Sequence, residues 1–216
     1  AGSDFPSPPQ ASYRQLMSMT SDYGLTPHAP GRHFAYNNEG VQFYGVAMDK
    51  QFFDSIGPVA VLQRIFWDTI GRQDEVRFTG YWSGWDGGFA ISARDCARLG
   101  LLVQRRGEWN GKQILSRAFV DALFTHQIPA GATENKSTGQ ATGKSNKWNQ
   151  QQFNREMSEG YSYGFWILRG DTLAPNEAIA ANGRGGNYII IAPRHELVIA
   201  VTNNQTNPPP PKPERY

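Results

Sequence analysis

A tyrosine and two asparagines stand together in the octet HFAYNNEG, residues 33–40, where the pattern predicts the start of a helix. A helix N-terminus offers backbone N–H groups without intrahelical partners and the positive end of the helix dipole. Tyr36 and Asn38 would lie side by side at that end, where a polar pair would meet an electropositive backbone. Taken alone, the octet is explained more simply by a buried aromatic residue followed by a helix cap.

A second polar group, Asn182-Gly183-Arg184-Gly185-Gly186, stands ahead of an apolar run and taken alone is simply a turn. The general catalytic motifs are absent, because the sequence contains no G-x-S-x-G elbow and no P-loop. Its histidines form no H-E-x-x-H motif and no close ligand pair, so we expect neither a metal nor a cofactor. The four histidines are His28, His33, His126 and His195.

Two tryptophans, Trp82 and Trp85, bracket Ser83 in a glycine-rich stretch. Aromatic side chains of this kind can line a substrate cleft. Core packing or contact with a lid explains them equally well, and the sequence leaves the two alternatives open.

Helical patterns that can position these residues occupy the first part of the chain. Ser12, Ser92 and Ser116 each stand at the predicted start of a helix, as N-caps do. Asp95 follows Ser92 at capping-box spacing, so we expect it to turn back toward the helix start in a structural role. The predicted helices cover residues 12–19, 37–53, 58–71, 92–107 and 116–124.

Strand patterns follow a polar stretch at residues 127–159, which is rich in Gln, Asn, Lys, Thr, Ser and Gly. A loop of that length is either functional or disordered, and we expect it to shape the mouth of a cleft. The order of helices first and strands afterwards predicts an α+β fold with an antiparallel sheet. The predicted strands cover residues 161–168, 178–183, 187–193 and 196–204.

The composition excludes several classes of protein. The chain has 216 residues, 39% of them hydrophobic, with 23 glycines and 14 prolines, which suits a globular unit rich in loops. A net charge of +2 without a basic stripe argues against nucleic acid as the main partner. No apolar run reaches the 18 residues of a membrane span. A single cysteine, Cys96, forbids an internal disulfide and fits a small core residue.

Four segments in order resemble the beta-lactamase-related serine hydrolases, a family that includes class C beta-lactamases, esterases, amide hydrolases and D-amino-acid peptidases. Their order and spacing carry the resemblance, which runs from about residue 12 to residue 204. It implies an incomplete beta-lactamase or penicillin-recognising fold. The segments are SYRQLMSMTSDYGL, PGRHFAYNNEGVQFYG, GGFAISARDCARLGLLVQRRGEWNGKQILS and NGRGGNYIIIAPRHELVIAVTNN.

The resemblance gives the two polar groups roles in hydrolysis. Tyr36-Asn37-Asn38 matches the family's Tyr-x-Asn motif, which implies that Tyr36 shuttles the proton of the nucleophile and that Asn38 holds the substrate. The family's third motif aligns with Asn182, Gly183, Arg184 and Gly185, where a strand edge supplies an oxyanion-binding N–H. Periplasmic or secreted proteins are common in this family, and the resemblance slightly favours such a location.

The sequence departs from the family at the nucleophile. The family uses the serine of a Ser-x-x-Lys motif, and no serine here has a lysine three places on. Ser21 and Ser83 are the serines near motif segments, and neither lies in an activating pattern. A tyrosine of pKa about 10 needs a shift of roughly 3 units, or about 4 kcal/mol, to act as a base near pH 7. The lysine that would supply much of this shift is missing.

Two functions are therefore compatible with the sequence. The first is a serine hydrolase that cleaves an ester or amide through an acyl-enzyme, with residues 12–204 as a domain that lacks its N-terminal segment, residues 1–11 as a leader and residues 205–216 as a Pro-rich tail. We expect these 216 residues alone to be inactive, and their substrate to be a small ester, amide or peptide. The second is a relative that has lost its nucleophile and binds a peptide or sugar.

Two geometric expectations follow. Tyr36 and the Gly183–Gly185 backbone should converge, because a base and an oxyanion donor must both reach one reacting atom, each at about 3 Å. A separation of the Tyr36 hydroxyl and the Gly183 nitrogen well beyond about 12 Å would exclude this. The strands should form one antiparallel sheet with alternating buried residues and an exposed edge, to be covered by a missing N-terminal segment, a partner chain or a homodimer contact.

Overall fold

Three serine caps define helices as the sequence predicts. A computed structural model of the chain describes residues 11–21, 29–34, 36, 38–78, 89–128, 130, 133–134, 158–183 and 185–203. The side chains of Ser12, Ser92 and Ser116 accept hydrogen bonds from the backbone N–H three residues on, at 3.2, 3.1 and 3.2 Å. Each cap satisfies a backbone donor that the first helical turn leaves open. The capped helices are α1 (Tyr13–Met17), α5 (Ala93–Gln104) and α6 (Arg117–Leu123).

The remaining helices are α2 and a rod that packs beside α5. Helix α2 covers Asn38–Phe52, and the predicted helix at 58–71 is one rod made of α3 (Pro58–Leu62), a π-helical segment (Gln63–Trp67) and α4 (Asp68–Ile70). Gly71 ends this rod with a φ of 72°. Buried side chains of the rod pack on Leu102 of α5 and on Trp109, which joins these helices to the rest of the structure.

A five-stranded antiparallel sheet follows in the order β11-β10-β9-β8-β7. The predicted single strand at 161–168 is wrong, because it is a hairpin. Ser162 N–H donates to the carbonyl of Phe165 at 2.8 Å, and Gly164 takes a φ of 84° that a glycine adopts readily. The strands are β7 (Ser158–Tyr161), β8 (Trp166–Leu168), β9 (Ile179–Gly183), β10 (Asn187–Ala192) and β11 (Leu197–Val201).

Short strand pairs complete the described structure. β1 (His33–Phe34) pairs in parallel with β6 (Thr133–Glu134), so that the start of the polar stretch lies beside the segment that leads to Tyr36. β2 (Arg77–Phe78) pairs with β3 (Phe89–Ala90), and β4 (Glu108–Trp109) pairs with β5 (Lys112–Gln113). A 3-10 turn at Pro193–His195 joins β10 to β11.

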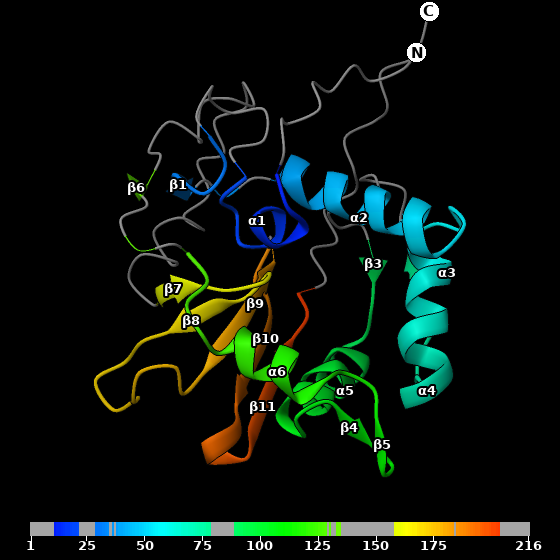
Figure 1. Cartoon of the computed structure of the whole chain (residues 1–216). Helices are drawn as coiled ribbons and strands as arrows, with labels where there is room; N and C mark the ends of the chain where they lie inside the picture. Colours follow the sequence, from blue (N-terminus) through cyan, green and yellow to red (C-terminus); the bar gives the residue numbers. More distant parts are fainter. Residues whose placement is uncertain are drawn as a thin grey trace, which may run out of the picture.

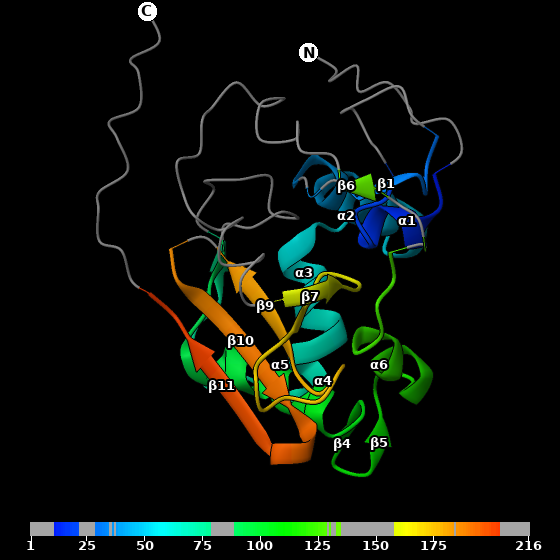
Figure 2. The same cartoon turned by 90° about the vertical axis from the view of Figure 1, so that its left-hand side faces the viewer.

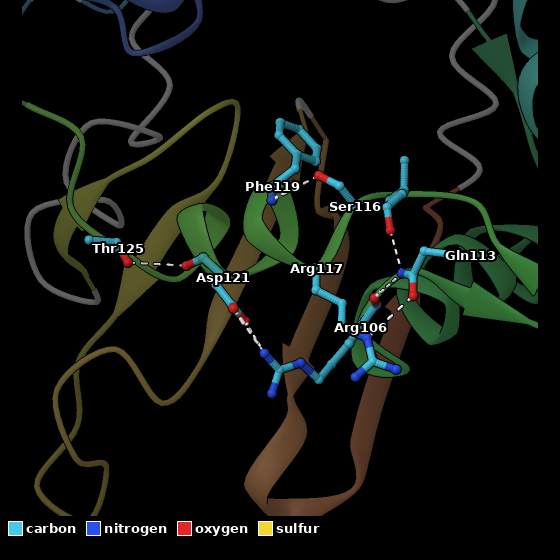
Figure 3. Close-up of polar contacts among 8 residues, drawn as sticks. Arg106, Gln113, Ser116, Arg117, Phe119, Asp121 and Thr125 are labelled. Atoms are coloured by element: carbon cyan, nitrogen blue, oxygen red, sulfur yellow. Dashed lines mark hydrogen bonds and ion pairs between the residues drawn. The ribbon is translucent and has the colours of Figure 1, made fainter.

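Helices α5 and α6 cover one face of the sheet (Figures 1 and 2). Helix α5 lies close to β10 and β11, because a Cβ on Gly100 would come within 2.6 Å of the Val198 side chain. At the surface, Arg106 holds both carboxylate oxygens of Asp121 on α6 at 2.8 Å (Figure 3). Both partners of that pair are exposed, so the apolar contacts account for most of the stabilisation. The core on this face contains Val103, Val120, Leu123, Tyr163, Ile167, Ile179 and Ile191.

Burial along the strands is only partly the alternation that the sequence predicts. Strand β11 alternates between exposed and half-buried residues. All three residues of β8 are buried, because Ile167 faces the α5 and α6 core while Trp166 and Leu168 belong to two other clusters. A short strand covered on both faces carries no alternating pattern.

Strand β11 forms an edge of the sheet as far as the described residues extend, and it is apolar. Leu197, Ile199 and Val201 remain 43%, 40% and 44% exposed. The strand Leu-Val-Ile-Ala-Val contains no charge or proline of the kind that discourages association at a sheet edge. The predicted exposure of an edge and of apolar side chains is therefore confirmed for the part of the chain that the structure describes.

We predict that Ile199→Lys reduces concentration-dependent association of the chain, because a charge at the centre of β11 opposes pairing of its edge. Sedimentation velocity over a range of concentrations measures the effect. Val46→Lys is the matched control, since Val46 is 48% exposed but lies on helix α2. Equal effects of the two substitutions would show that exposed apolar area, and not the strand edge, drives association.

The carboxylate of Asp95 joins the start of α5 to the loop after α4. It is fully buried and accepts hydrogen bonds from the backbone N–H groups of Gln73 and Asp74, at 2.8 and 3.0 Å. The Ser92 hydroxyl lies 3.4 Å from the same carboxylate. The expected turn toward the helix start is thus observed, and its main partners are in another loop. These contacts support the predicted structural role.

We expect Asp95→Ala to lower the free energy of unfolding by about 1–3 kcal/mol, because it leaves two buried N–H donors without their acceptor. Urea denaturation measures the change. Asp121→Ala, which removes an exposed ion pair, should cost about 0–1 kcal/mol. An Asp95→Asn variant that kept its melting temperature but lost turnover in an active form of the protein would contradict the structural role.

Candidate active site

Tyr36 lies in an aromatic cluster at one end of the sheet. Its ring stacks on Trp166 of β8, with ring centroids 5.7 Å apart and planes at 29°. It also meets Tyr161 of β7 edge-on at 6.1 Å. Met19, Phe34 and Val41 complete the surroundings of the stack. Tyr36 is therefore held by strands that follow it much later in the sequence.

The strand register connects this cluster to the third motif. Tyr161 is opposite Trp166, and Trp166 is opposite Ala180 of β9. The pairing of β8 with β9 ends at Trp166–Ala180, whereas β9 continues to Gly183. Gly183 is three residues beyond Ala180, a rise of roughly 10 Å along a strand. Figure 2 shows that β9 runs toward the end of the molecule that holds β1, α1 and α2.

The turn after β9 is tied to the end of β11. Asn203, which follows β11, donates its backbone N–H to the side-chain oxygen of Asn187 at 2.9 Å and its amide N–H to the carbonyl of Gly185 at 2.8 Å. Gly185 and Gly186 both take left-handed φ values, 86° and 85°. Asn187 and Asn203 lie in the fourth motif segment, but the sequence assigned neither of them a role, because a contact between the two ends of that segment leaves no local pattern.

Burial raises the pKa of Tyr36 above its ordinary value of 10. Burial also raises the pKa of Tyr161 well above that value, and the proximity of Tyr36 adds to the effect. A general base near pH 7 needs a shift in the opposite direction. In this chain Tyr36 is therefore a neutral phenol at neutral pH, and a cation has to come close to it before it can accept a proton.

The predicted site residues Trp82, Trp85 and Arg184 lie outside the described part of the chain, and so does Ser83, which was not expected to be a nucleophile. Asn38 opens helix α2, as expected, but its side chain also lies outside the described structure. Ser21 is buried, 3% exposed, which does not suit a nucleophile that must meet substrate. The roles predicted for Tyr36, Asn38, Arg184 and the glycines thus remain predictions.

The described residues contain no group of three or more His, Cys, Asp or Glu side chains placed to hold a metal ion. None of the helices seen in this part of the chain is both long and apolar enough to cross a membrane.

Solved structures share this fold, although no protein-family model matches the sequence and no curated protein is significantly similar to it. A beta-lactamase from Mycobacterium bovis gives a TM-score of 0.62 at 17% identity, over 89% of this chain and 66% of its own. A Bacteroides dorei DSM 17855 protein provisionally named a beta-lactamase gives 0.59 at 18% identity, over 88% and 64%. A Bacillus anthracis protein provisionally named a 6-aminohexanoate-dimer hydrolase gives 0.59 at 21% identity, over 81% and 39%.

The chain adopts part of the beta-lactamase fold. It spans 64%, 39% and 66% of the length of the Bacteroides, Bacillus and Mycobacterium proteins. The beta-lactamase fold predicted from the four motif segments is therefore confirmed, and so is its incompleteness relative to these structures. Identities of 17–21% establish the fold and leave the activity open.

We predict that Tyr36 titrates above pH 10 in this chain, and that Trp166→Leu lowers its pKa toward the ordinary value by admitting water to the ring. Chains labelled with ¹³C at tyrosine Cζ allow each phenol to be titrated by NMR, and the Tyr36 signal is the one lost in Tyr36→Phe. Trp67→Leu, in the separate cluster that Trp67 and Ile70 form with Leu102 and Trp109, should leave the Tyr36 pKa unchanged.

The same shift predicts a pH dependence of stability. The pKa of Tyr36 is higher in the folded chain than in the unfolded chain. The contribution of the neutral Tyr36 side chain to the free energy of unfolding is therefore fully present below about pH 10, and it is lost as the pH rises through the folded pKa. A Tyr36 signal that titrated below pH 10 would show that a cation already lies beside the phenol.

Proposed function

We propose that this chain carries the proton-transfer and oxyanion-binding parts of a serine hydrolase that cleaves an ester or amide bond through an acyl-enzyme. The stack of Tyr36 on Trp166 carries the proposal, because it brings the Tyr-x-Asn motif to the strand beside β9 and its third motif. The fold shared with the Mycobacterium beta-lactamase supports it. The names of the compared proteins denote hydrolases, which agrees with this reaction class.

In the proposed reaction a serine hydroxyl from a Ser-x-x-Lys segment attacks the carbonyl carbon of the substrate. Tyr36 takes the serine proton as the new C–O bond forms and passes it to the leaving amine or alkoxide. Backbone N–H groups at Gly183–Gly185 stabilise the negative oxygen of the tetrahedral intermediate. Asn38 holds the substrate, and Trp82 and Trp85 line the cleft. Water then releases the acyl group from the serine.

The neutral state of Tyr36 defines what the Ser-x-x-Lys segment must supply. A shift from 10 to about 7 corresponds to roughly 4 kcal/mol of preferential stabilisation of the phenolate, and here the shift starts from above 10. A lysine ammonium close to the phenol is the kind of group that can provide it. We therefore propose that residues 12–204 act as one unit together with such a segment and are inactive without it.

Beta-lactam hydrolysis itself is a less favoured activity. Asn182 occupies the place where the family often carries a lysine, and an amide pairs with a substrate carboxylate less strongly than a cation does. We therefore propose a small ester, amide or peptide substrate without naming it.

A ligand-binding relative is the alternative, and the raised pKa of Tyr36 is compatible with it. A phenol kept neutral by burial in a chain without a Ser-x-x-Lys motif suits recognition of a peptide or sugar as well as it suits an inactive catalytic group.

The deciding experiment supplies the missing motif. The residues encoded upstream of Ala1, or a Ser-x-x-Lys segment from a relative of this fold, are added to the chain, and serine labelling by a fluorophosphonate is measured. We expect labelling to appear and Tyr36→Phe to slow it by about 100-fold or more, the range typical for loss of a general base.

Tyr44→Phe is the matched control, because it removes a phenol hydroxyl from α2, where the ring contacts Tyr13. It should leave the labelling rate unchanged. A complemented chain that binds the added segment but stays inert to the fluorophosphonate would contradict the hydrolase and support the binding protein.

A further inference from the structure

The turn between β9 and β10 is held by a residue to which the sequence assigned no role. Asn203 follows β11, 16 residues from Asn187 and 18 from Gly185. Its backbone N–H binds the Asn187 side chain at 2.9 Å, and its side-chain amide binds the Gly185 carbonyl at 2.8 Å. One residue thus ties the end of the edge strand β11 to the turn that joins β9 to β10.

This turn has little stiffness of its own. Gly185 and Gly186 adopt left-handed φ values, and glycine moves between left-handed and right-handed regions at little cost. Gly183 pairs with Asn187 where the strands meet, so the register fixes both ends of the turn and leaves its middle to other contacts. Asn203 reaches that middle, where its amide nitrogen would lie 3.7 Å from a Cβ on Gly186.

Because a peptide group is planar, a hydrogen bond to the Gly185 carbonyl also fixes the direction of the Gly186 N–H. The C=O of Gly185 and the N–H of Gly186 belong to the same planar trans peptide and point in opposite directions. An amide that holds the carbonyl therefore aims the Gly186 N–H away from Asn203. Stabilisation of a developing oxyanion depends on donors that are aimed before the charge appears.

We infer that Asn203 is a positioning residue, which holds the Gly185–Gly186 peptide so that the turn after β9 presents backbone N–H groups to a tetrahedral oxyanion. The inference rests on the proposed function for the identity of the ligand. The positioning itself rests on two hydrogen bonds from one residue, which acts through the turn and does not touch the substrate.

The test uses the full chain and Asn203→Leu, which keeps the side-chain size and removes the amide without adding charge. Amide hydrogen exchange of Gly185, Gly186 and Asn187 reports the stiffness of the turn. Titration with phenylphosphonate, followed by the ¹⁵N–H signals of the same residues, reports binding of a tetrahedral anion. We expect exchange to become about fivefold faster and phenylphosphonate binding about fivefold weaker, as loss of a net hydrogen bond of about 1 kcal/mol predicts.

Gln113→Met is the matched control. Gln113 donates its side-chain amide to the Arg106 carbonyl at 2.7 Å, a similar clamp on the turn that follows α5 (Figure 3). This variant should leave both measurements at residues 185–187 unchanged. A melting temperature of Asn203→Leu close to that of the unaltered chain would show that the effect is local.

The outcomes separate the two claims. If Asn203→Leu changed neither hydrogen exchange nor phenylphosphonate binding, the positioning role of Asn203 would be overturned. The proposal of an oxyanion site would be unaffected. Faster exchange in Asn203→Leu, with no phenylphosphonate binding to the unaltered chain, would show that Asn203 stiffens the turn but would overturn the anion-binding part of both proposals.

Discussion

The register between β8 and β9 is the constraint on which the candidate site depends. Trp166 is opposite Ala180, and this pairing puts the Trp166 ring on the side of the sheet where Tyr36 can stack on it. A slip of one residue would turn Trp166 to the opposite face, where α5 and α6 form their core with Ile167. Tyr36 would then lose its contact with the sheet, and the two motifs would no longer share one end of it. The buried side chains on both faces of β8 oppose such a slip.

The same burial that orders Tyr36 also limits its chemistry. Aromatic neighbours hold the ring in place and exclude water, which favours the neutral phenol and raises its pKa. Under the proposed function, the position of Tyr36 and its activation as a base would therefore have different origins, since the sheet provides the position and a cation would provide the activation. A chain that spans 39–66% of the compared structures, and that has an apolar strand at the edge of its sheet, is consistent with a further segment that supplies both a cover and a charge.

Local patterns predicted the parts of the fold that depend on local physics. Ser12, Ser92 and Ser116 marked three helix starts because a cap interacts with its own first turn, and the apolar run at 187–193 marked β10 because strand burial leaves a pattern. The hairpin at 161–168 was missed because its turn contains aromatic residues and only one glycine. The stack of Tyr36 on Trp166 was beyond reach, because it joins residues far apart in the sequence without a motif in common. The clamp from Asn203 was also missed, because a contact between the two ends of one segment leaves no local pattern.

The central claim is that the Tyr-x-Asn motif and the third motif meet at one reacting atom. The distance between the Tyr36 hydroxyl oxygen and the Gly183 backbone nitrogen in a crystal of the chain, preferably with phenylphosphonate bound, tests it most directly. The proposed function predicts that the two atoms lie within about 12 Å of each other, with the ligand between them. A distance well beyond about 12 Å, with Tyr36 still stacked on Trp166, would contradict the shared site and leave the chain with the fold but without the catalytic arrangement.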